Sequence, residues 1–468
     1  MIYHKQAIEL ISRLRAQFSV QIIKNNSPFH NKAAELLPEE DHFRLDIMLR
    51  NSVYREEIVG ATYQELTLTL EKETLIANDV YILQASGPSA TAQVGNLASA
   101  GFKPKGNYYF RLLMPLQEQI YLHYSLEERH FESDLGFISR LGTAAVINGE
   151  ELTICTFPVE DKWYLSIESP AKQDLDSFAD KAFAVLCGLG FISGHLAGEQ
   201  GWYFAYANPE MREIVGWQFW QKRKTIRTIY KPVYTNPYAF KDIPKHIQDD
   251  FHEQNRLRTI SLPEFSKLCE HLYHNASLRG AIILTLESLT GSLILMPAGL
   301  SVVLETLSDV ILGDKKLDLK PIQTERLKKE ILGEFRNTLS KFQEALGPDG
   351  YNILRGKIDN INQPTNRTRL TAPFEAVGIK LSQEDFKMLN ARNDFLHGRT
   401  IDLAKLGEDR SDDKKDQDTY YAATRLYTLI SMLILRWVGY DNYVVNHCVT
   451  QNQIAQLDIT EDAFRALS

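Results

Sequence analysis

The chain has 468 residues, of which 44% are hydrophobic and 24% are charged, and its formal net charge is −8. A chain of this length exceeds the size at which one hydrophobic core usually keeps growing, so two or three domains are expected. The acidic charge argues against a protein that coats nucleic acid non-specifically, because such binding needs a broad basic face. It still permits an enzyme whose basic residues are confined to one cleft.

The N-terminal part, residues 1–235, is expected to form a β-rich domain with flanking helices. Runs of β-branched and aromatic residues, alternating or continuous, predict strands after a short amphipathic first helix. The expected strands cover residues 20–23, 42–48, 62–71, 80–84, 108–114, 120–124, 152–157, 163–167, 202–206, 217–220 and 225–230. Helical spacing predicts a helix over residues 176–189. The interval 86–101, rich in Gly, Ala and Ser, is expected to be a loop.

Aromatic and then basic residues crowd the end of this part. Core packing of a β-domain is the favoured interpretation of the aromatic side chains between Trp202 and Trp220, and a ligand surface is the alternative. The densest basic run of the chain follows, from Lys222 to Lys231. We interpret that run as an edge strand whose charges protect it from pairing with other chains. The alternative is a row of basic side chains that contacts successive phosphates of a nucleic acid.

The remainder is expected to be helical, which makes the protein a multidomain α+β chain with an all-α helical bundle at its C-terminal side. Two prolines place the junction in a linker and connecting helix over residues 236–262. The bundle is assigned to residues 263–445 and a C-terminal tail to 446–468. The expected helices cover residues 264–290, 298–312, 324–346, 351–361, 382–398 and 420–440. Residues 362–373, with two prolines, and the highly charged segment 402–418 are expected to be loops.

Membrane insertion and a metal site are not expected. Residues 281–304 are apolar, but Glu287 and Pro297 interrupt them, which predicts two buried helices joined near residues 291–299. The four cysteines lack the spacing of a disulfide framework or a zinc site and indicate a reducing compartment. The first 18 residues lack the apolar core of a signal peptide. We therefore expect a cytoplasmic protein that has no membrane partner and no cofactor.

Residues 382–399 carry the candidate chemistry. Ser382 and Asp385 have the spacing of a capping box, so a helix is expected to begin there. Arg392 falls within the apolar arc of that helix, where a cation is costly unless an anion meets it. Asn393 and His397 lie one turn apart at the edge of the same arc.

These residue types suit the cleavage of a phosphodiester bond in RNA. An arginine can hold a phosphate with two parallel hydrogen bonds, and a histidine exchanges protons near neutral pH. With an asparagine to orient a neighbouring group, attack by the ribose 2′-OH needs no metal. The structural alternative is that Arg392 pairs with a core carboxylate such as Glu287 or Glu305, and that His397 caps the end of the helix.

The segment Arg392-Asn393-Asp394-Phe395-Leu396-His397 resembles the Arg-x4-His motif of HEPN-superfamily ribonucleases. Residues from about 263 to 445 resemble the helical HEPN domain of ApeA-like abortive-infection proteins. The resemblance implies that Arg392 and His397 are the catalytic pair and that Asn393 is the assisting polar residue.

The same resemblance implies an endoribonuclease of bacterial anti-phage defence, which acts on RNA as a homodimer through its HEPN domain. The N-terminal domain would then sense a phage-derived trigger or restrain the nuclease. Further RNA contacts are expected at Arg367, Arg369 and Arg399. The alternative is a non-catalytic module that binds a nucleotide or RNA, or that dimerises, with Arg392 as a ligand clamp or a structural residue.

Overall fold

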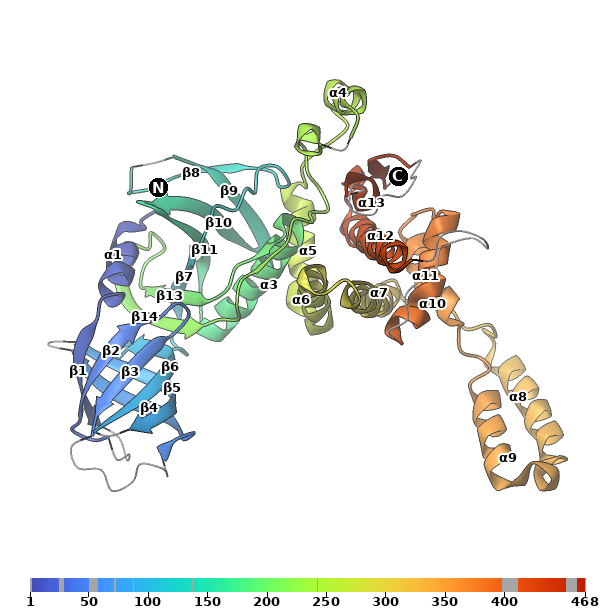
Figure 1. Ribbon diagram of the computed structural model, residues 1–468, viewed down its shortest axis with the longest axis horizontal. Helices are drawn as coiled ribbons and strands as arrows, with labels where there is room; N and C mark the ends of the chain where they lie inside the picture. Colours follow the sequence, from blue (N-terminus) through green and yellow to red (C-terminus); the bar gives the residue numbers. More distant parts are fainter. Residues whose placement is uncertain are drawn as a thin grey trace. The chain divides into compact units, whose positions relative to one another are not determined.

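The computed structural model describes residues 2–24, 29–49, 58–70, 73–86, 88–136, 138–241, 243–397, 411–451 and 461–467. The chain divides into two compact units, Met1–Thr290 and Gly291–Ser468. The first unit is rich in β-strands and the second consists mainly of helices (Figure 1). This confirms the expected multidomain α+β class.

The first six strands form a closed antiparallel barrel. Their order is β3-β2-β1-β4-β5-β6, and β3 also pairs with β6, so the ring of strands closes. Alternate residues such as Leu36, Leu45 and Ala92 are fully buried, as the two-residue period of a strand requires. The strands are β1 (Phe18–Lys24), β2 (Ala33–Pro38), β3 (Phe43–Met48), β4 (Thr62–Leu70), β5 (Glu73–Ser86) and β6 (Ser89–Ser99).

A second set of strands continues from the barrel. Strand β6 also pairs with β14, which begins an antiparallel sheet of order β14-β13-β7-β11-β10-β9-β8. These strands are β7 (Tyr108–Leu116), β8 (Arg129–Glu132), β9 (Ile138–Ile147), β10 (Glu150–Val159), β11 (Lys162–Gln173), β13 (Gln200–Tyr206) and β14 (Ile214–Gln221). The two-residue strands β12 (His195–Leu196) and β15 (Ile226–Arg227) pair separately.

Helix α3 (Leu175–Ser193) packs on strands β7 and β11 of this sheet. It begins at Asp174, whose carboxylate accepts the backbone N–H of Ser177 at 2.9 Å, and it ends at Gly194 in the left-handed conformation. The other helices of the unit are α1 (Lys5–Leu14), α4 (Lys245–Glu253), α5 (Leu262–His274), α6 (Ala276–Thr290) and the short 3-10 helix η1 (Pro237–Ala239).

Three expectations for the first unit were wrong. Most of the interval 86–101 is not a loop, because residues 89–99 form β6, which buries Ala90, Ala92 and Val94 in the barrel with period two. Residues 120–124 lie between β7 and β8 and outside both strands. The expected helix 264–290 is two helices, because Asn275 is extended and its side chain accepts the N–H of Leu278, which starts α6.

The division between the units falls at residue 290, later in the chain than the expected junction at 236–262. Helix α5 packs on α3 and β9, and α6 packs on α3. A Cβ atom at Gly188 in α3 would lie 3.1 Å from the sulfur of Cys269 in α5, so the two helices approach closely where the side chain is absent. Helices expected in the C-terminal bundle therefore complete the core of the first unit.

The second unit is built around α12, which is almost continuously buried from Asp418 to Val438. Helices α7 and α11 pack on α12, and α10 packs on α7 and α11. The helices are α7 (Leu295–Asp314), α8 (Glu325–Ser340), α9 (Gln343–Asp359), α10 (Asn366–Ala376), α11 (Gln383–Leu396), α12 (Asp412–Val438) and α13 (His447–Thr450). A short antiparallel pair, β16 (Tyr443–Val445) and β17 (Phe464–Ala466), follows α12.

The predicted loops of this unit need two corrections. Residues 362–373 are largely helical, because the Thr365 hydroxyl accepts the N–H of Thr368 and starts α10, which tolerates Pro373 near its end. Residues 411–418 begin α12, whereas 402–410 lie outside the described residues. The apolar region near residue 290 is two helices, as predicted. Within the described residues, α7 alone is long and apolar enough to cross a membrane, and half of its most apolar window is buried in the protein.

Candidate functional site

Helix α11 carries the motif, and its position follows from a cap and an apolar face. The backbone N–H of Ser382 donates to the Asp385 carboxylate at 2.8 Å, and the N–H of Asp385 donates to the Ser382 hydroxyl at 3.2 Å. This is the predicted capping box. Met388, Leu389 and Phe395 are buried as expected. Leu396, which was expected on the same arc, is 39% exposed.

Arg392 faces helix α7, where its guanidinium forms an ion pair with the Glu305 carboxylate. The Arg392 side chain is 13% exposed and the Glu305 side chain is 35% exposed. Burial lowers the pKa of the Arg392 guanidinium from its usual value. The cation in the apolar arc therefore has the anionic partner that its position requires.

A second arginine shares this location. Arg369 on α10 donates to Asp309 at 2.5 Å, and Asp309 lies one turn after Glu305 on α7. Both arginines and both carboxylates line a cavity of about 20 Å³. A cavity of that size holds about one water molecule. Two cations and two anions from three helices thus meet at a small polar site.

The other candidate residues are placed differently. His397 is exposed at the end of α11, and its N–H donates to the Asp394 carbonyl at 3.1 Å. The guanidinium of Arg367 lies 5.3 Å from the ring centre of Phe386, a cation–π contact. The side chain of Asn393 and all of Arg399 lie outside the described residues. The structure therefore brings together Arg392 and Arg369, while the roles assigned to all six residues stay predictions.

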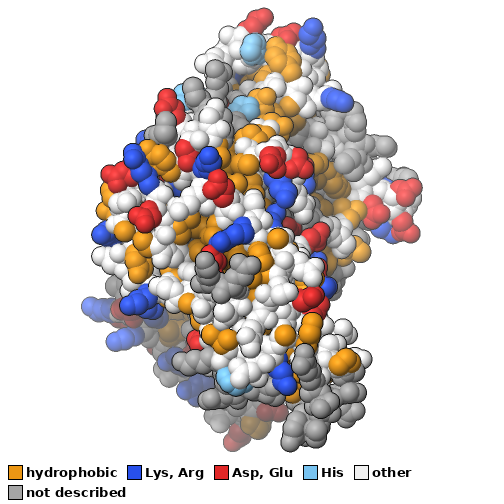
Figure 2. Space-filling view, turned by 90° about the vertical axis from the view of Figure 1, so that its left-hand side faces the viewer, with side chains coloured by type: hydrophobic (Ala, Val, Ile, Leu, Met, Phe, Trp, Pro, Cys, Tyr) orange, Lys and Arg blue, Asp and Glu red, His pale blue; other side chains and the backbone are white. Residues whose placement is uncertain are grey.

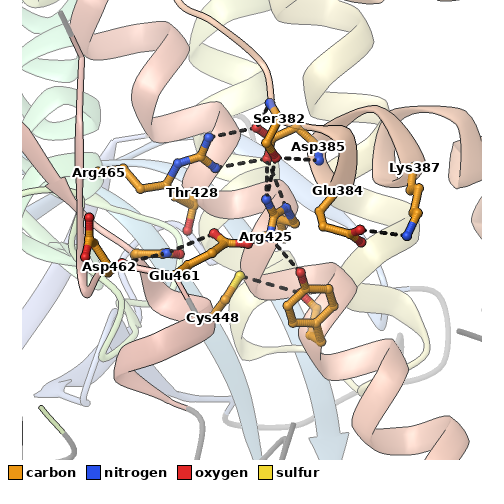
Figure 3. Close-up of polar contacts among 12 residues, drawn as sticks. Ser382, Glu384, Asp385, Lys387, Arg425, Thr428, Cys448, Glu461, Asp462 and Arg465 are labelled. Carbon is orange, nitrogen blue, oxygen red and sulfur yellow. Dashed lines mark hydrogen bonds and ion pairs between the residues drawn. The ribbon is translucent and has the colours of Figure 1, made fainter. Parts of the chain in front are cut away.

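Sequence reasoning missed a buried charge network at the start of α11 (Figure 3). Asp385 has no exposed surface and accepts hydrogen bonds from Arg425 at 2.9 Å and from both terminal nitrogens of Arg465, at 3.0 and 2.7 Å. Burial would raise the pKa of Asp385, but the hydrogen bonds and charges of Arg465 and Arg425 outweigh it and hold this pKa below its usual value.

Arg425 extends the network to the C-terminal segment. It also donates to the Glu461 carboxylate at 2.5 Å, to the Tyr421 hydroxyl at 2.6 Å and to the Ser382 hydroxyl at 2.9 Å. Two carboxylates and two guanidiniums therefore balance one another. The network joins the first turn of α11 to α12 and to β17, so it holds the motif helix rather than offering a free binding site. The signal in the sequence was Arg425 itself, a cation within the apolar part of α12.

The basic run of the first unit is largely occupied by structural contacts. Arg223 pairs with Glu287, and Arg227 pairs with Glu118. The Lys222 ammonium lies 4.4 Å from the ring centre of Trp220, and burial lowers the pKa of Lys222 to about 8. Acidic and basic side chains are interspersed on the face shown in Figure 2. These pairings favour the structural interpretation of the basic run.

The first unit also contains a larger cavity, of about 630 Å³, within the size range of ligand pockets. Residues from α1, from the start of β5, from the end of β6 and from the start of β14 line it. Arg13 and Glu73 form an ion pair of 2.8 Å in its wall. With Trp217 and Leu10 as apolar lining, this cavity has the size and the mixed lining of a binding pocket.

Comparison of the chain with family models, with curated proteins and with solved structures finds no match.

Proposed function

We propose that the protein is a metal-independent endoribonuclease of the HEPN type that acts in bacterial anti-phage defence. The observation that supports this proposal best is that Arg392, on the helix whose exposed end carries His397, meets Arg369 of α10 at one polar site. The function itself rests on the resemblance of residues 392–397 to the Arg-x4-His motif.

The proposed reaction is an internal transfer at an RNA phosphate. The ribose 2′-oxygen bonds to phosphorus, His397 accepts its proton, and the bond to the 5′-oxygen breaks as that oxygen takes up a proton from water. The products are a 2′,3′-cyclic phosphate and a free 5′-hydroxyl. Arg392 would stabilise the charge that develops on the phosphate oxygens, with Arg369 as a second cation.

The Glu305 carboxylate must share the Arg392 guanidinium with the phosphate, or leave it, for this chemistry to take place. A guanidinium has five N–H donors, so Arg392 can keep one contact with Glu305 and offer the rest to a phosphate. The 20 Å³ cavity is too small for a phosphate, which must therefore dock at its mouth or displace the carboxylates. This competition would keep the activity of the resting protein low.

The test is RNA cleavage by the full chain in EDTA, with the product ends identified by mass spectrometry. We expect 2′,3′-cyclic phosphate ends, a loss of at least about 100-fold in rate for Arg392→Ala and for His397→Ala, and a faster rate for Glu305→Gln. Arg326→Ala is the matched control, because Arg326 is an exposed arginine of the same unit. Cleavage that survives both motif substitutions removes the assignment.

The competing proposal is a non-catalytic module in which Arg392 is structural, and the ion pair with Glu305 favours it. In that case Arg392→Ala leaves a partly buried carboxylate without its partner and costs about 3–5 kcal/mol of unfolding free energy. If the pair is instead weakly held and screened by solvent, as a nuclease that must release Arg392 to a phosphate requires, the cost is about 1 kcal/mol or less. Chemical unfolding of Arg392→Ala, Glu305→Ala and the double variant measures the coupling directly.

Three further proposals rest on the resemblance to HEPN ribonucleases. The protein would act as a homodimer through its HEPN-like region, a phage-derived trigger would bind the N-terminal unit, and the protein would be cytoplasmic. The 630 Å³ cavity beside α1 is the place in that unit where we expect a trigger to bind.

A further inference from the structure

The barrel and the second sheet diverge beside α1 (Figure 1), and the 630 Å³ cavity lies where they diverge. Strand β14 begins at Ile214, but it pairs with β6 only at residues 218–220. Strand β6 meanwhile stays paired with β5 as far as Ser99. Among the described residues, no strand therefore lies beside the first residues of β14 on the side of the cavity.

Two backbone N–H groups in this part of β14 are bonded to side chains instead of to a strand. The Ser99 hydroxyl accepts the N–H of Trp217 at 3.1 Å and donates to the Trp217 carbonyl at 3.4 Å. The side-chain oxygen of Gln6 on α1 accepts the N–H of Ile214 at 3.2 Å. All four residues line the cavity. A strand edge whose hydrogen-bonding groups face open space is the arrangement to which an extended peptide adds as a further strand.

A β-bulge lies at the same edge. The pairing of β13 with β14 goes from Ala205 and Gly216 to Tyr206 and Ile214, so Val215 is an extra residue. The Val215 side chain is 42% exposed. A bulge bends its strand and ends regular pairing, and bulges are frequent beside functional sites. This bulge belongs to the end of β14 that lines the cavity.

The lining of the cavity combines apolar and charged side chains. Leu75 and Trp217 are buried and supply apolar surface. Glu9 and Arg13, one turn apart on α1, and Glu73 at the start of β5 supply charge. Arg13 pairs with Glu73, whereas none of the described cations pairs with Glu9, which is exposed. Two carboxylates and one guanidinium give the lining a net charge of −1, with Glu9 available for a cation of the ligand.

We infer that this cavity binds an extended peptide that carries a basic side chain, and that the peptide pairs with the first residues of β14. The peptide backbone would take over the hydrogen bonds that Ser99 and Gln6 now make, and its cation would lie beside Glu9. The binding itself does not depend on the proposed nuclease function. Only the further step, that such a peptide is the trigger, rests on that function.

Two other kinds of ligand fit less well. A nucleotide would meet two carboxylates and only one guanidinium, which already pairs with Glu73. A purely apolar ligand would remove Glu9 and the ion pair from water without replacing the lost hydrogen bonds. An extended basic peptide matches both the charge of the lining and the strand edge.

The experiment measures the binding of synthetic hexapeptides to the full chain by isothermal titration calorimetry. The peptides have blocked ends, alternate valine with threonine, and carry lysine or aspartate at the third position. We expect the lysine peptide to bind at least about 10-fold more tightly than the aspartate peptide, because Glu9 attracts one and repels the other. Methylation of the backbone nitrogens of the lysine peptide should weaken its binding at least about 10-fold, because a strand without N–H donors cannot pair.

Substitutions in the protein locate the site. Gly101→Trp should prevent binding, because Gly101 lines the cavity and a Cβ atom there meets nothing within 4 Å, so the indole can enter the open space. Gly280→Trp is the matched control: a Cβ atom at this exposed glycine also meets nothing within 4 Å, but Gly280 is not part of the lining. Glu9→Gln should remove the preference for lysine over aspartate. Thermal unfolding of all three variants should match the wild type.

A lysine peptide that shows no saturable binding overturns the inference, as does equal binding by the wild type and the Gly101→Trp variant. Equal binding of the methylated and the unmethylated peptide overturns it as well, because the ligand is then not held as a strand. No RNA is present in these measurements. Binding with the expected pattern therefore supports the inference even if the protein does not cleave RNA.

Discussion

A carboxylate with no exposed surface needs balancing charge close by, because removing an ion from water costs several kcal/mol. Asp385 has two guanidiniums for this purpose, and it also caps the helix that carries the motif. The spacing of Ser382 and Asp385 was enough to predict the cap. It could not reveal Arg425 and Arg465, which lie 40 and 80 residues further on, because only tertiary packing brings them together.

Asp385→Asn should destabilise the second unit by about 3–5 kcal/mol, since two largely buried guanidiniums then lose their shared anion. Urea unfolding followed by circular dichroism measures the change. Glu384→Gln is the matched control: Glu384 lies in the same turn, but it pairs with Lys387 at the surface, where such a pair contributes at most about 1 kcal/mol. Equal effects for the two substitutions would show that the network adds no stability.

The elements that were predicted well are those whose pattern is local. Helix α3 followed from its apolar spacing, and strands such as β7 and β10 followed from runs of β-branched and aromatic residues. Strand β6 was missed because alanine serves there as the inward residue of a narrow barrel, which composition alone presents as a loop. Helix α10 was missed because the two prolines of residues 362–373 predicted a loop, and the sequence alone did not show the Thr365 cap or the burial of Phe374.

Gly194→Ala should destabilise the first unit more than Gly439→Ala destabilises the second. Both glycines end a helix with positive φ, +71° and +105°. A Cβ at Gly194 would lie 2.5 Å from the Thr228 carbonyl oxygen, whereas nothing lies within 4 Å of one at Gly439. We expect about 1 kcal/mol for Gly439→Ala and at least twice that for Gly194→Ala, measured by thermal unfolding.

At the scale of the molecule, sequence patterns separated a β-rich part from a helical part but misplaced the helices between them. Helices α5 and α6 have the apolar spacing of bundle helices, and that spacing does not specify which partner buries their apolar faces. Close packing at Gly188 assigns α5 to the first unit. The candidate site shows the same limit of sequence patterns. The position of Arg392 in an apolar arc predicted an anionic partner, but only the fold shows that this partner is Glu305.

A fragment of residues 1–290 should fold cooperatively, whereas a fragment of residues 1–262 should aggregate. The shorter fragment lacks α5 and α6 and leaves the apolar face of α3 uncovered, including the surface that Phe265 and Leu286 contact. Solubility and the sharpness of the thermal transition distinguish the two. Comparable behaviour of both fragments would place the boundary of the folding unit before α5.

The distance along the chain between Asp385 and Arg465 has a consequence during protein synthesis. Because the ribosome produces the chain from its N-terminus, α11 emerges 80 residues before the second cation that holds it. A prematurely terminated product that ends between residues 398 and 460 would contain both Arg392 and His397 but would lack Glu461 and Arg465. Translation errors of this kind would therefore release chains whose motif helix is not yet fixed in place.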